Sequence, residues 1–570
     1  AAAEPLPRTG SDMAEHDSTK PTMGTRDEPG ATPAEPPALA EAASAAKPVV
    51  REDSLKETFE SIVIAFILAF VFRAYIVEAF IIPTGSMAPT LLGAHLDVRS
   101  PHSGYRYTTN GPTANGVALP GMQQSTDVLD PMTVLPQRVP RGTRTSTGDR
   151  ILVQKYIYFL SEPRRWDVVV FKAPHSPEEN FIKRLVGKPQ EDLYLLDGNV
   201  YVRPRGKDWR IARKSDRPAV QRAVWQPIYH SAYVPLPSLT TPVGEEGFVV
   251  PWKPQNRPDD WDLTGRDAYA YTGVGPSRLA FDFDAGPYQS FPAMYPYNQF
   301  MPISPSTQLH PIEDVRLAVT VTSESNQAHE LSLETTGRWD AASEKTPPQR
   351  LRGVIDERGG ARLEVIDGPS AEPRTLAQGE VAPLQAGEPR RFELWFVDQH
   401  LILWHAGRRV CEAKLDVSME KLQTRPPPAP LPAPAITVSG PATLRAVQLD
   451  RDLHYRSLES LGSGGNHALG GLPRNRRGRV IQREPVRLGG DEFYCLGDNS
   501  PASGDSRYWG EPHPWIAEEA FADPTRARAG IVPRELMIGR AFFVYFPAPL
   551  KLAPEHPGVI PNFAGMRFIY

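Results

Sequence analysis

The sequence predicts a mainly β protein that begins with a membrane helix and contains one β-domain interrupted by a second, larger one. Three observations support this fold class. Proline (61) and glycine (44) are abundant among the 570 residues, which indicates many turns. One apolar run near the N-terminus is long enough to span a membrane. Beyond it, short β-branched and aromatic runs recur between turn residues, and a chain of this length needs more than one core.

The N-terminal part of the chain divides into a polar tail and an apolar run. Residues 1–54 are rich in Ala, Pro, Glu and Thr and poor in aromatic residues. They cannot bury enough apolar area to offset the entropy of ordering, so we expect a disordered tail. Residues 55–82 form the expected transmembrane anchor, within which Ser61 to Phe72 carry no charge and Arg73 must reach the membrane surface.

Two other interpretations of this run are a cleaved signal peptide and a buried core helix. The anchor is favoured over the signal peptide because no A-x-A cleavage site follows the apolar residues. Lys47, Arg51 and Lys56 precede the run. The positive-inside rule therefore places the tail in the cytoplasm and everything after Phe80 on the extracytoplasmic side.

The first β-domain is expected at residues 83–210 and again, after a linker, within 461–550. Its early strand patterns are "RILVQKYIYFL" (150–160), "WDVVVFKAP" (166–174), "FIKRLVG" (181–187) and "DLYLLDGNVYV" (192–202). The last of these predicts a hairpin around Asp197-Gly198. "EFYCLGDNS" and "MIGRAFFVYF" resume the pattern near the end of the chain, before a tail at 551–570. A turn-rich insertion occupies 95–145.

The larger insertion, residues 211–460, predicts an independent β-sandwich. "VRLAVTVTS" (315–323) alternates, and "RFELWFVDQHLILWHAGRRV" (391–410) indicates two strands joined near Asp398-Gln399. Trp395 and Trp404 are expected in its core. The proline tract at 425–435 predicts a stiff loop, and the glycine-rich residues 461–473 a flexible linker back to the first domain.

Composition excludes several functional classes. The net charge of −4 is small for this length, so nucleic acid is not an expected partner. The two cysteines, Cys411 and Cys495, are too few for a disulfide scaffold or a four-thiolate metal site, and they fall in different expected domains. No metal or organic cofactor is predicted.

A serine occupies an unusual place in "FIIPTGSMAPTLLG" (80–93), directly after the apolar run. A serine hydroxyl is a poor nucleophile until a neighbouring base takes its proton. None of the 13 histidines lies in a motif that indicates a catalytic partner. A buried lysine is the other base known for this role, because burial lowers its pKa.

The early strands offer three such lysines: Lys155, Lys172 and Lys183. The period-2 alternation of a strand points Lys183 and Arg184 to opposite faces, so one can be buried while the other is solvated. The residue pattern leaves the choice among the three lysines open. Lysine in a strand is also commonly a solvated residue that protects a sheet edge.

A third segment, "LGDNSPASGDSRYWG" (496–510), follows an apolar strand and brings together Gly497, Asp498, Asn499, Ser503, Asp505 and Arg507. Taken alone, it predicts an Asx-rich turn with an ion pair between Asp505 and Arg507.

In their order along the chain, these motifs resemble those of bacterial type I signal peptidases. The resemblance rests on "IPTGSMAPTL" after the anchor, "GDRILVQKYIY", "DVVVFKAP", "FIKRLVGKP" and "GDNSPASGDSRYWG", within residues 55–99, 147–212 and 485–546. It implies a signal-peptidase-type β-domain. By resemblance, Ser86 is the nucleophile and Lys183 the general base. Thr84 and the Ser86 amide form the oxyanion hole, Ser503 orients the lysine, Asp505 and Arg507 support the loop that also contains Asp498, and Met87 shields the site.

The resemblance further implies a membrane-bound serine endopeptidase that removes signal peptides from exported preproteins. Its partners would be signal peptides, with small residues one and three positions before the cut, and membrane lipid. Its place would be the bacterial cytoplasmic membrane, with one span and the β-domain outside. Two alternatives stay open: an anchored binding protein with an inactive peptidase-like domain, and a self-cleaving regulator that uses the same Ser-Lys chemistry.

The chain departs from the family pattern at two positions near the strands. Gln190 in "GKPQED" stands where the family usually has a turn glycine, and Trp166 stands where a glycine commonly precedes Asp-Val-Val-Val-Phe. If Gln190 needs a positive φ, the turn has been remodelled. Neither position belongs to the proposed chemistry.

Two further resemblances concern the insertions. "RSPHSGYRY" resembles a cysteine knuckle with Ser100 and Ser103 at the thiol positions, and Asp130 and Thr133 could form its partner. We therefore hypothesise a decayed zinc ribbon that binds no metal, with an unrelated loop as the alternative. The sandwich resembles concanavalin-like or laminin-G-like jelly rolls, which implies a glycan or polypeptide ligand; a spacer without a ligand is the alternative.

Overall fold

The computed structural model describes residues 55–114, 117–133, 135–235, 249–283, 312–325, 329–337, 347–424, 433–455, 484–519 and 527–570. The expected disordered tail, residues 425–432 of the proline tract and the return linker at 461–473 lie outside the described residues.

Helix α1 (Leu55–Tyr75) is, within the described ranges, the one helix whose length and composition would allow it to cross a membrane. It ends earlier than predicted. Residues Val77–Ile81 form strand β1, which pairs antiparallel with β8 (Arg150–Gln154). The register brings Glu78 to an ion pair with Lys155 at 3.2 Å, which accommodates the charge that interrupts the apolar run. The predicted end of the anchor at residue 82 was therefore wrong.

The first β-domain is built on a sheet with the order β1-β8-β32-β9-β10-β30-β31, to which β33 adds by pairing with β32. Strand β32, from the end of the chain, lies between β8 and β9, so the two separated segments form one domain. Its other strands are β9 (Val168–Ala173), β10 (Ser176–Gly187), β30 (Glu492–Leu496), β31 (Val532–Pro533), β32 (Met537–Phe546) and β33 (Arg567–Phe568). Two apolar clusters draw on alternate residues of β9, Val168 and Val170 in one and Val169 and Phe171 in the other, so both faces of the sheet are covered there.

A separate, smaller sheet has the order β13-β12-β11-β29. Its strands are β11 (Glu191–Leu196), β12 (Asn199–Pro204), β13 (Arg210–Ile211) and β29 (Val486–Arg487). Asp197 and Gly198 both have positive φ, at 50° and 84°, so the predicted hairpin turn is confirmed. The strand expected over 150–160 stops at Gln154, and Ile157–Leu160 forms the short helix α2 instead.

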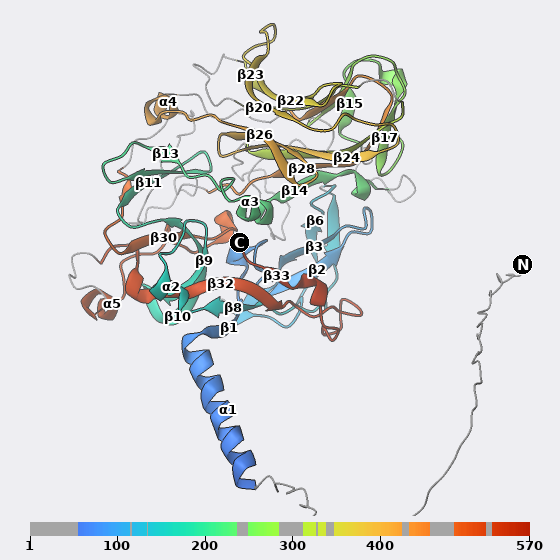
Figure 1. Cartoon of the computed structure of the whole chain (residues 1–570). Helices are drawn as coiled ribbons and strands as arrows, with labels where there is room; N and C mark the ends of the chain where they lie inside the picture. Colours follow the sequence, from blue (N-terminus) through green and yellow to red (C-terminus); the bar gives the residue numbers. More distant parts are fainter. Residues whose placement is uncertain are drawn as a thin grey trace, which may run out of the picture. The chain divides into compact units, whose positions relative to one another are not determined.

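The larger insertion forms two sheets that share one apolar core, so the predicted β-sandwich is confirmed (Figure 1). One sheet has the order β16-β17-β28-β19-β24-β25-β26 with β14 beside β28, and the other has the order β15-β18-β27-β20-β21-β22-β23. Trp395 and Trp404 are buried. The turn at Asp398-Gln399 joins β24 to β25 as predicted, and residues 408–414 add a further strand, β26.

The strands of the sandwich are β14 (Gln226–His230), β15 (Trp252–Pro254), β16 (Trp261–Asp262), β17 (Ala268–Tyr271), β18 (Ser277–Phe281), β19 (Val315–Ser323), β20 (Leu331–Gly337), β21 (Gln349–Ile355), β22 (Gly360–Ile366), β23 (Arg374–Glu380), β24 (Pro389–Val397), β25 (His400–His405), β26 (Arg408–Lys414), β27 (Ala435–Val438) and β28 (Ala442–Arg451). Short helices α3 (Pro218–Val224), α4 (Met419–Thr424) and α5 (Pro514–Glu519) complete the described helices beside α1 and α2.

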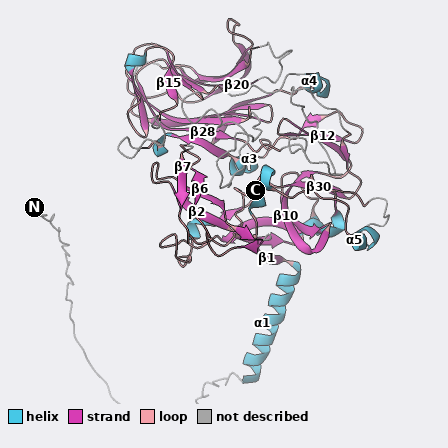
Figure 2. Ribbon diagram, turned by 180° about the vertical axis from the view of Figure 1, so that it is seen from behind, coloured by secondary structure: helices cyan, strands magenta, loops and turns pink. Residues whose placement is uncertain are grey.

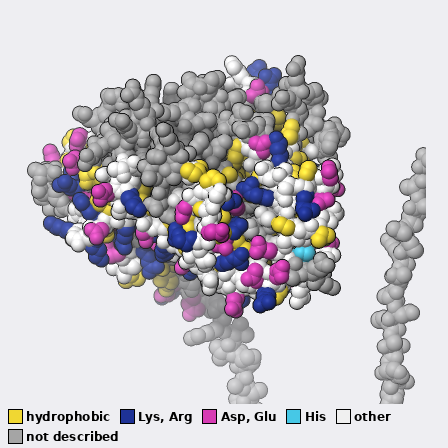
Figure 3. Space-filling model, turned by 90° about the horizontal axis from the view of Figure 1, so that it is seen from above, with side chains coloured by type: hydrophobic (Ala, Val, Ile, Leu, Met, Phe, Trp, Pro, Cys, Tyr) yellow, Lys and Arg dark blue, Asp and Glu magenta, His cyan; other side chains and the backbone are white. Residues whose placement is uncertain are grey.

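The insertion at 95–145 consists of hairpins, which Figure 2 shows from behind. They pair β2 (His95–Arg99) with β3 (Arg106–Asn110), β4 (Thr113–Ala114) with β5 (Val117–Ala118), and β6 (Thr126–Leu129) with β7 (Pro136–Val139). Figure 3 shows basic and acidic side chains interspersed on the face seen from above, in keeping with the small net charge of −4. Cys411 and Cys495 are both buried and unbridged.

Candidate active site

Ser86 lies in a tight helical turn, η1 (Gly85–Met87), that follows β1 and Thr84. Met87 anchors the turn, because its side chain is fully buried and packs with Ile82 and Leu91. A Cβ on Gly85 would lie 2.3 Å from the Oδ1 atom of Asn110, so a larger residue there would require the Asn110 side chain to move. Ser86 is thereby held at a defined position and is 8% exposed.

Lys183 lies on β10 and contacts Ser86. Its Nζ atom lies 2.9 Å from Ser86 Oγ and donates to the carbonyl oxygen of Ile182 at 3.0 Å. The lysine side chain is buried, with 4% exposure. Burial lowers the pKa of Lys183 to about 8, and the nearby carboxylate of Asp505 opposes that shift. With a pKa near 8, about a tenth of the amine is neutral at pH 7, and this fraction is available to accept a proton from the serine.

The other two lysines do not share this position. Lys155 is paired with Glu78, and Lys172 pairs across the sheet with Asn180, three residues along β10 from Lys183. Among the three lysines that the sequence left as alternatives, Lys183 is the one recorded in hydrogen-bond contact with Ser86.

The neighbouring Arg184 is buried as well, so the expectation that one residue of this pair is solvated was wrong. Strand β10 lies between β9 and β30 and is covered on both faces, which leaves water on neither side. Arg184 is instead neutralised by Asp498. Its Nε and Nη2 atoms donate to the two carboxylate oxygens, each at 2.7 Å, and Thr90 Oγ1 also donates to Asp498.

The loop after β30 is organised by the predicted ion pair between Asp505 and Arg507, which is present and fully buried. Arg507 donates from Nε and Nη2 to Asp505 at 2.8 and 2.6 Å, and the Gly497 amide donates to the same carboxylate at 2.9 Å. The third guanidinium nitrogen, Nη1, donates to Ser500 Oγ at 2.8 Å. The Asp505 carboxylate therefore holds the start of the loop, at Gly497, against its end, at Arg507.

Asn499 connects this loop to the serine, a role that the sequence did not reveal. Its backbone amide donates to the Ser86 carbonyl at 3.0 Å, and its side-chain amide donates to the Gly85 carbonyl at 3.1 Å. An asparagine directly after a buried aspartate was the available signal, but Asx residues are so common in turns that it pointed to a turn alone.

Thr84 and Ser503 occupy contrasting places. Thr84 is exposed, and its side chain makes no capping hydrogen bond to the turn. The first amides of any helical turn have no carbonyl within that turn to which they can donate. Ser503 is buried, and a Cβ on Gly497 would lie 2.1 Å from its Oγ. That hydroxyl has no hydrogen-bond partner in the described part of the chain, so the expected bond to Lys183 is not formed in this structure.

Replacing Arg507 by methionine is expected to lower the free energy of unfolding by about 3–5 kcal/mol, because Asp505 would stay buried without a counter-charge. Urea unfolding of the purified protein measures this change. The matched control is Arg138→Met in the exposed pair with Asp127, which should cost at most about 1 kcal/mol. Equal costs for the two variants would contradict a structural role for the buried pair.

The four knuckle positions of the 95–145 insertion come together in the fold. Ser100, Ser103, Asp130 and Thr133 are all buried. Ser103 Oγ donates to Asp130 Oδ2 at 2.8 Å, and the Met132 amide donates to Asp130 Oδ1 at 2.8 Å. Hydrogen bonds thus join the two segments at these positions, and whether they derive from a zinc ribbon stays a hypothesis.

Three carboxylates outside the serine site, Asp314, Asp398 and Asp452, lie within 4.8 Å of one another. A cation from the chain itself already pairs with two of them. Lys214 Nζ lies 2.7 Å from Asp398 and 2.9 Å from Asp452, and Gln221 donates to Asp452 at 2.7 Å. The cluster is therefore a buried ion network and not a vacant metal site.

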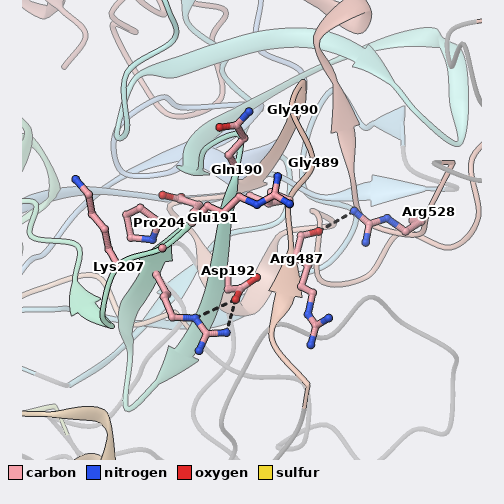
Figure 4. Close-up of a pocket in the computed structure, with 13 residues that line it drawn as sticks. Gln190, Glu191, Asp192, Pro204, Lys207, Arg487, Gly489, Gly490 and Arg528 are labelled. Carbon is pink, nitrogen blue, oxygen red and sulfur yellow. Dashed lines mark hydrogen bonds and ion pairs between the residues drawn. The ribbon is translucent and has the colours of Figure 1, made fainter.

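A separate cleft of about 820 Å³ lies on the small sheet (Figure 4). Gln190 lines it with φ of 60°, so this departure from the family pattern keeps a left-handed turn with a non-glycine residue. Much of its charge is internally paired: Asp192 accepts from Arg203, and Arg528 pairs with Glu492. Neither Ser86 nor Lys183 lines this cleft, so it is distinct from the candidate active site.

Comparison with known proteins finds similarity to one family of peptidases. Residues 140–235 match the family described as signal peptidase, peptidase S26. Signal peptidase I of Rickettsia typhi is 28% identical over 149 residues, which cover 26% of this chain and 44% of that protein. Signal peptidase I of Aquifex aeolicus is 54% identical over 41 residues, 7% of this chain and 16% of that protein. The chain thus spans less than half the length of these relatives.

Among solved structures, the carbohydrate-binding module CBM66 from Bacillus subtilis aligns with a TM-score of 0.23 and 10% identity, over 35% of this chain and 96% of that one. A Bacillus subtilis protein of unknown function with a galectin-like fold aligns with a TM-score of 0.22 and 9% identity, over 35% of this chain and 89% of that one. Likeness this low carries no inference about a ligand.

Proposed function

We propose, on the premise that the chain resembles type I signal peptidases, that it is a membrane-anchored serine endopeptidase that cleaves signal peptides from exported preproteins. The observation that carries the proposal is the pair formed by Ser86 and Lys183, 2.9 Å apart and buried. A lysine amine with a lowered pKa beside a serine hydroxyl is the arrangement that activates a serine without histidine.

In the proposed reaction, Ser86 Oγ attacks the carbonyl carbon of the scissile bond while Lys183 takes its proton. Thr84 and the Ser86 amide stabilise the oxyanion that forms. The lysine then returns the proton to the leaving amine, and the peptide bond breaks as the ester to Ser86 remains. Water hydrolyses this ester, with Lys183 again accepting a proton, and restores the serine.

The substrate would bind as an extended segment, with backbone hydrogen bonds for affinity and pockets for alternate side chains. By resemblance to the family, those pockets accept small residues one and three positions before the cut. Helix α1 would hold the site at the extracytoplasmic surface of the membrane, where such segments emerge; its apolar side chains from Phe66 to Phe72 are exposed in the structure.

The proposal is tested by incubating the detergent-purified full chain with a preprotein and identifying the new N-terminus by mass spectrometry. Cleavage is expected directly after an alanine whose second neighbour upstream is also small. The matched control is the same preprotein with a bulky residue at the position before the cut, which should remain whole. Failure to cleave the first substrate, or equal cleavage of both, would contradict the proposal.

Replacing Thr84 by valine, which keeps the shape and removes the hydroxyl, is expected to lower kcat by about 10²–10³-fold with little change in KM. An oxyanion donor acts on charge that develops only in the transition state. Steady-state kinetics on the preprotein measures the split. The control is Thr126→Val in the insertion, and a change in KM alone for the Thr84 variant would assign the hydroxyl to substrate binding instead.

A further inference from the structure

Trp166 contacts both the start of the large insertion and the buried arginine beside the candidate active site. It is fully buried and adopts φ of 75°, a conformation that bulky side chains rarely take and that favours the glycine expected from the family pattern. Strained backbone of this kind persists only where the surroundings hold it in place. The contacts of Trp166 on its two sides show what those surroundings are.

On the side of the sandwich, the indole ring meets the segment that leads into the large insertion. Its Nε1 atom donates to the Arg213 carbonyl at 3.1 Å, and the Lys214 ammonium lies 5.3 Å from the ring centroid. Lys214 is in turn fixed by Asp398, at the turn between β24 and β25, and by Asp452, directly after β28. The orientation of the indole therefore depends on carboxylates that the sandwich supplies.

On the side of the serine, the backbone of Trp166 holds the buried arginine. Arg184 Nη1 donates to the Trp166 carbonyl at 2.7 Å, and Nε and Nη2 of Arg184 donate to the two carboxylate oxygens of Asp498. Asp498 precedes Asn499, whose two amides donate to the carbonyls of Ser86 and Gly85. Each step in this series is a direct hydrogen bond, a ring contact or a peptide link between buried groups.

We infer that Trp166 is a positioning residue for the proposed peptidase reaction, by which the sandwich insertion sets the place of the Asp498–Asn499 segment behind Ser86. The inference rests on the proposed function and adds to it that the sandwich is required for full turnover. A glycine at position 166 would suit the local backbone but would leave Arg184 without a fixed carbonyl and Lys214 without its ring.

The first test measures activity in the full chain. Trp166→Gly is expected to lower kcat by about tenfold to a hundredfold while KM changes little, because misplacing the nucleophile affects the reacting step. Trp166→Phe keeps the ring over Lys214 and should recover most of that loss. The matched control is Trp252→Phe in the sandwich core, where Nε1 is buried without a hydrogen-bond partner among the described residues; its kcat should equal that of the wild type.

A double-mutant cycle asks whether the effect passes through the ion network. Asp452→Asn is expected to lower kcat severalfold in the wild-type background and to have no further effect once Trp166 is glycine. Equal effects in both backgrounds, or a fall in kcat for Trp252→Phe as large as for Trp166→Gly, would overturn the inference in favour of a general loss of stability.

Hydrogen exchange supplies a readout that needs no turnover and so separates this inference from the proposed function. In Trp166→Gly, the amides of residues 497–507 should exchange faster, while those of the sandwich core stay protected. Unchanged exchange in that loop would overturn the inference even if the protein is an active peptidase. Faster exchange in a chain that cleaves no preprotein would support the connection and refute the peptidase assignment alone.

Discussion

Replacing Ser86 by alanine is expected to lower the rate of preprotein cleavage by at least about 10⁴-fold, because the proposed reaction forms its ester on the Ser86 hydroxyl. The substitution removes one oxygen from a side chain that is 8% exposed, so the fold should be unaffected. Binding of the signal peptide should also persist. Rapid-mixing kinetics with a fluorescent preprotein measures the loss of turnover, and a pull-down in detergent measures the retained binding.

The control for this prediction is Ser500→Ala, in the same loop system but bonded to Arg507 through its hydroxyl. That variant should lose stability before it loses turnover per folded molecule. Substantial cleavage by the Ser86 variant at the same bond would show that another nucleophile operates and would remove the basis of the proposed mechanism.

Much of this fold followed from local pattern. The hairpin at Asp197-Gly198, the turn at Asp398-Gln399 and the strand at 315–323 were each set by residues adjacent in sequence, and the structure has them where the sequence predicted them. The end of the anchor was missed for a physical reason. Val77–Ile81 is apolar enough to continue a helix, and only its pairing with β8, some seventy residues away, makes it a strand.

The candidate site was predictable to the extent that it lies in short motifs. Ser86 and the Asp505–Arg507 pair stand in segments that the residue pattern marked, whereas Lys183 was chosen among three lysines only by the family resemblance. The structure brings the serine to the lysine and the aspartate to the arginine. The burial of Arg184 was not predictable from alternation, because that rule assumes a sheet with one wet face. Here, clusters on both sides of β9 and β10 exclude water.

The contacts that sequence reasoning missed join segments that are far apart. Asn499 bonds to Gly85 across 414 positions, and Trp166 depends on a network from the sandwich. Trp166 and Gln190 each stand where a glycine was expected, and each keeps the positive φ that favours glycine. A local rule flags such residues as departures, but only the tertiary structure supplies the reason.

Replacing Lys183 by methionine is expected to abolish turnover to about the same degree as loss of the serine, since methionine fills the space and cannot accept a proton. Lys183→Arg should be equally inactive, because a guanidinium stays protonated at every accessible pH. The control is Lys155→Met, whose lysine is paired with Glu78, and this variant should keep wild-type kcat. Activity in the arginine variant would exclude a neutral base at position 183.

The same lysine predicts the pH dependence of the reaction. Because burial lowers the pKa of Lys183 to about 8, the reactive neutral amine is the minor form below that pH and the major form above it. We expect kcat/KM to rise about tenfold per pH unit below pH 8 and to level off above it. Measuring cleavage between pH 6 and 10 decides the matter. A profile that is flat, or that falls where the amine becomes neutral, would mean that the proton goes elsewhere than to Lys183.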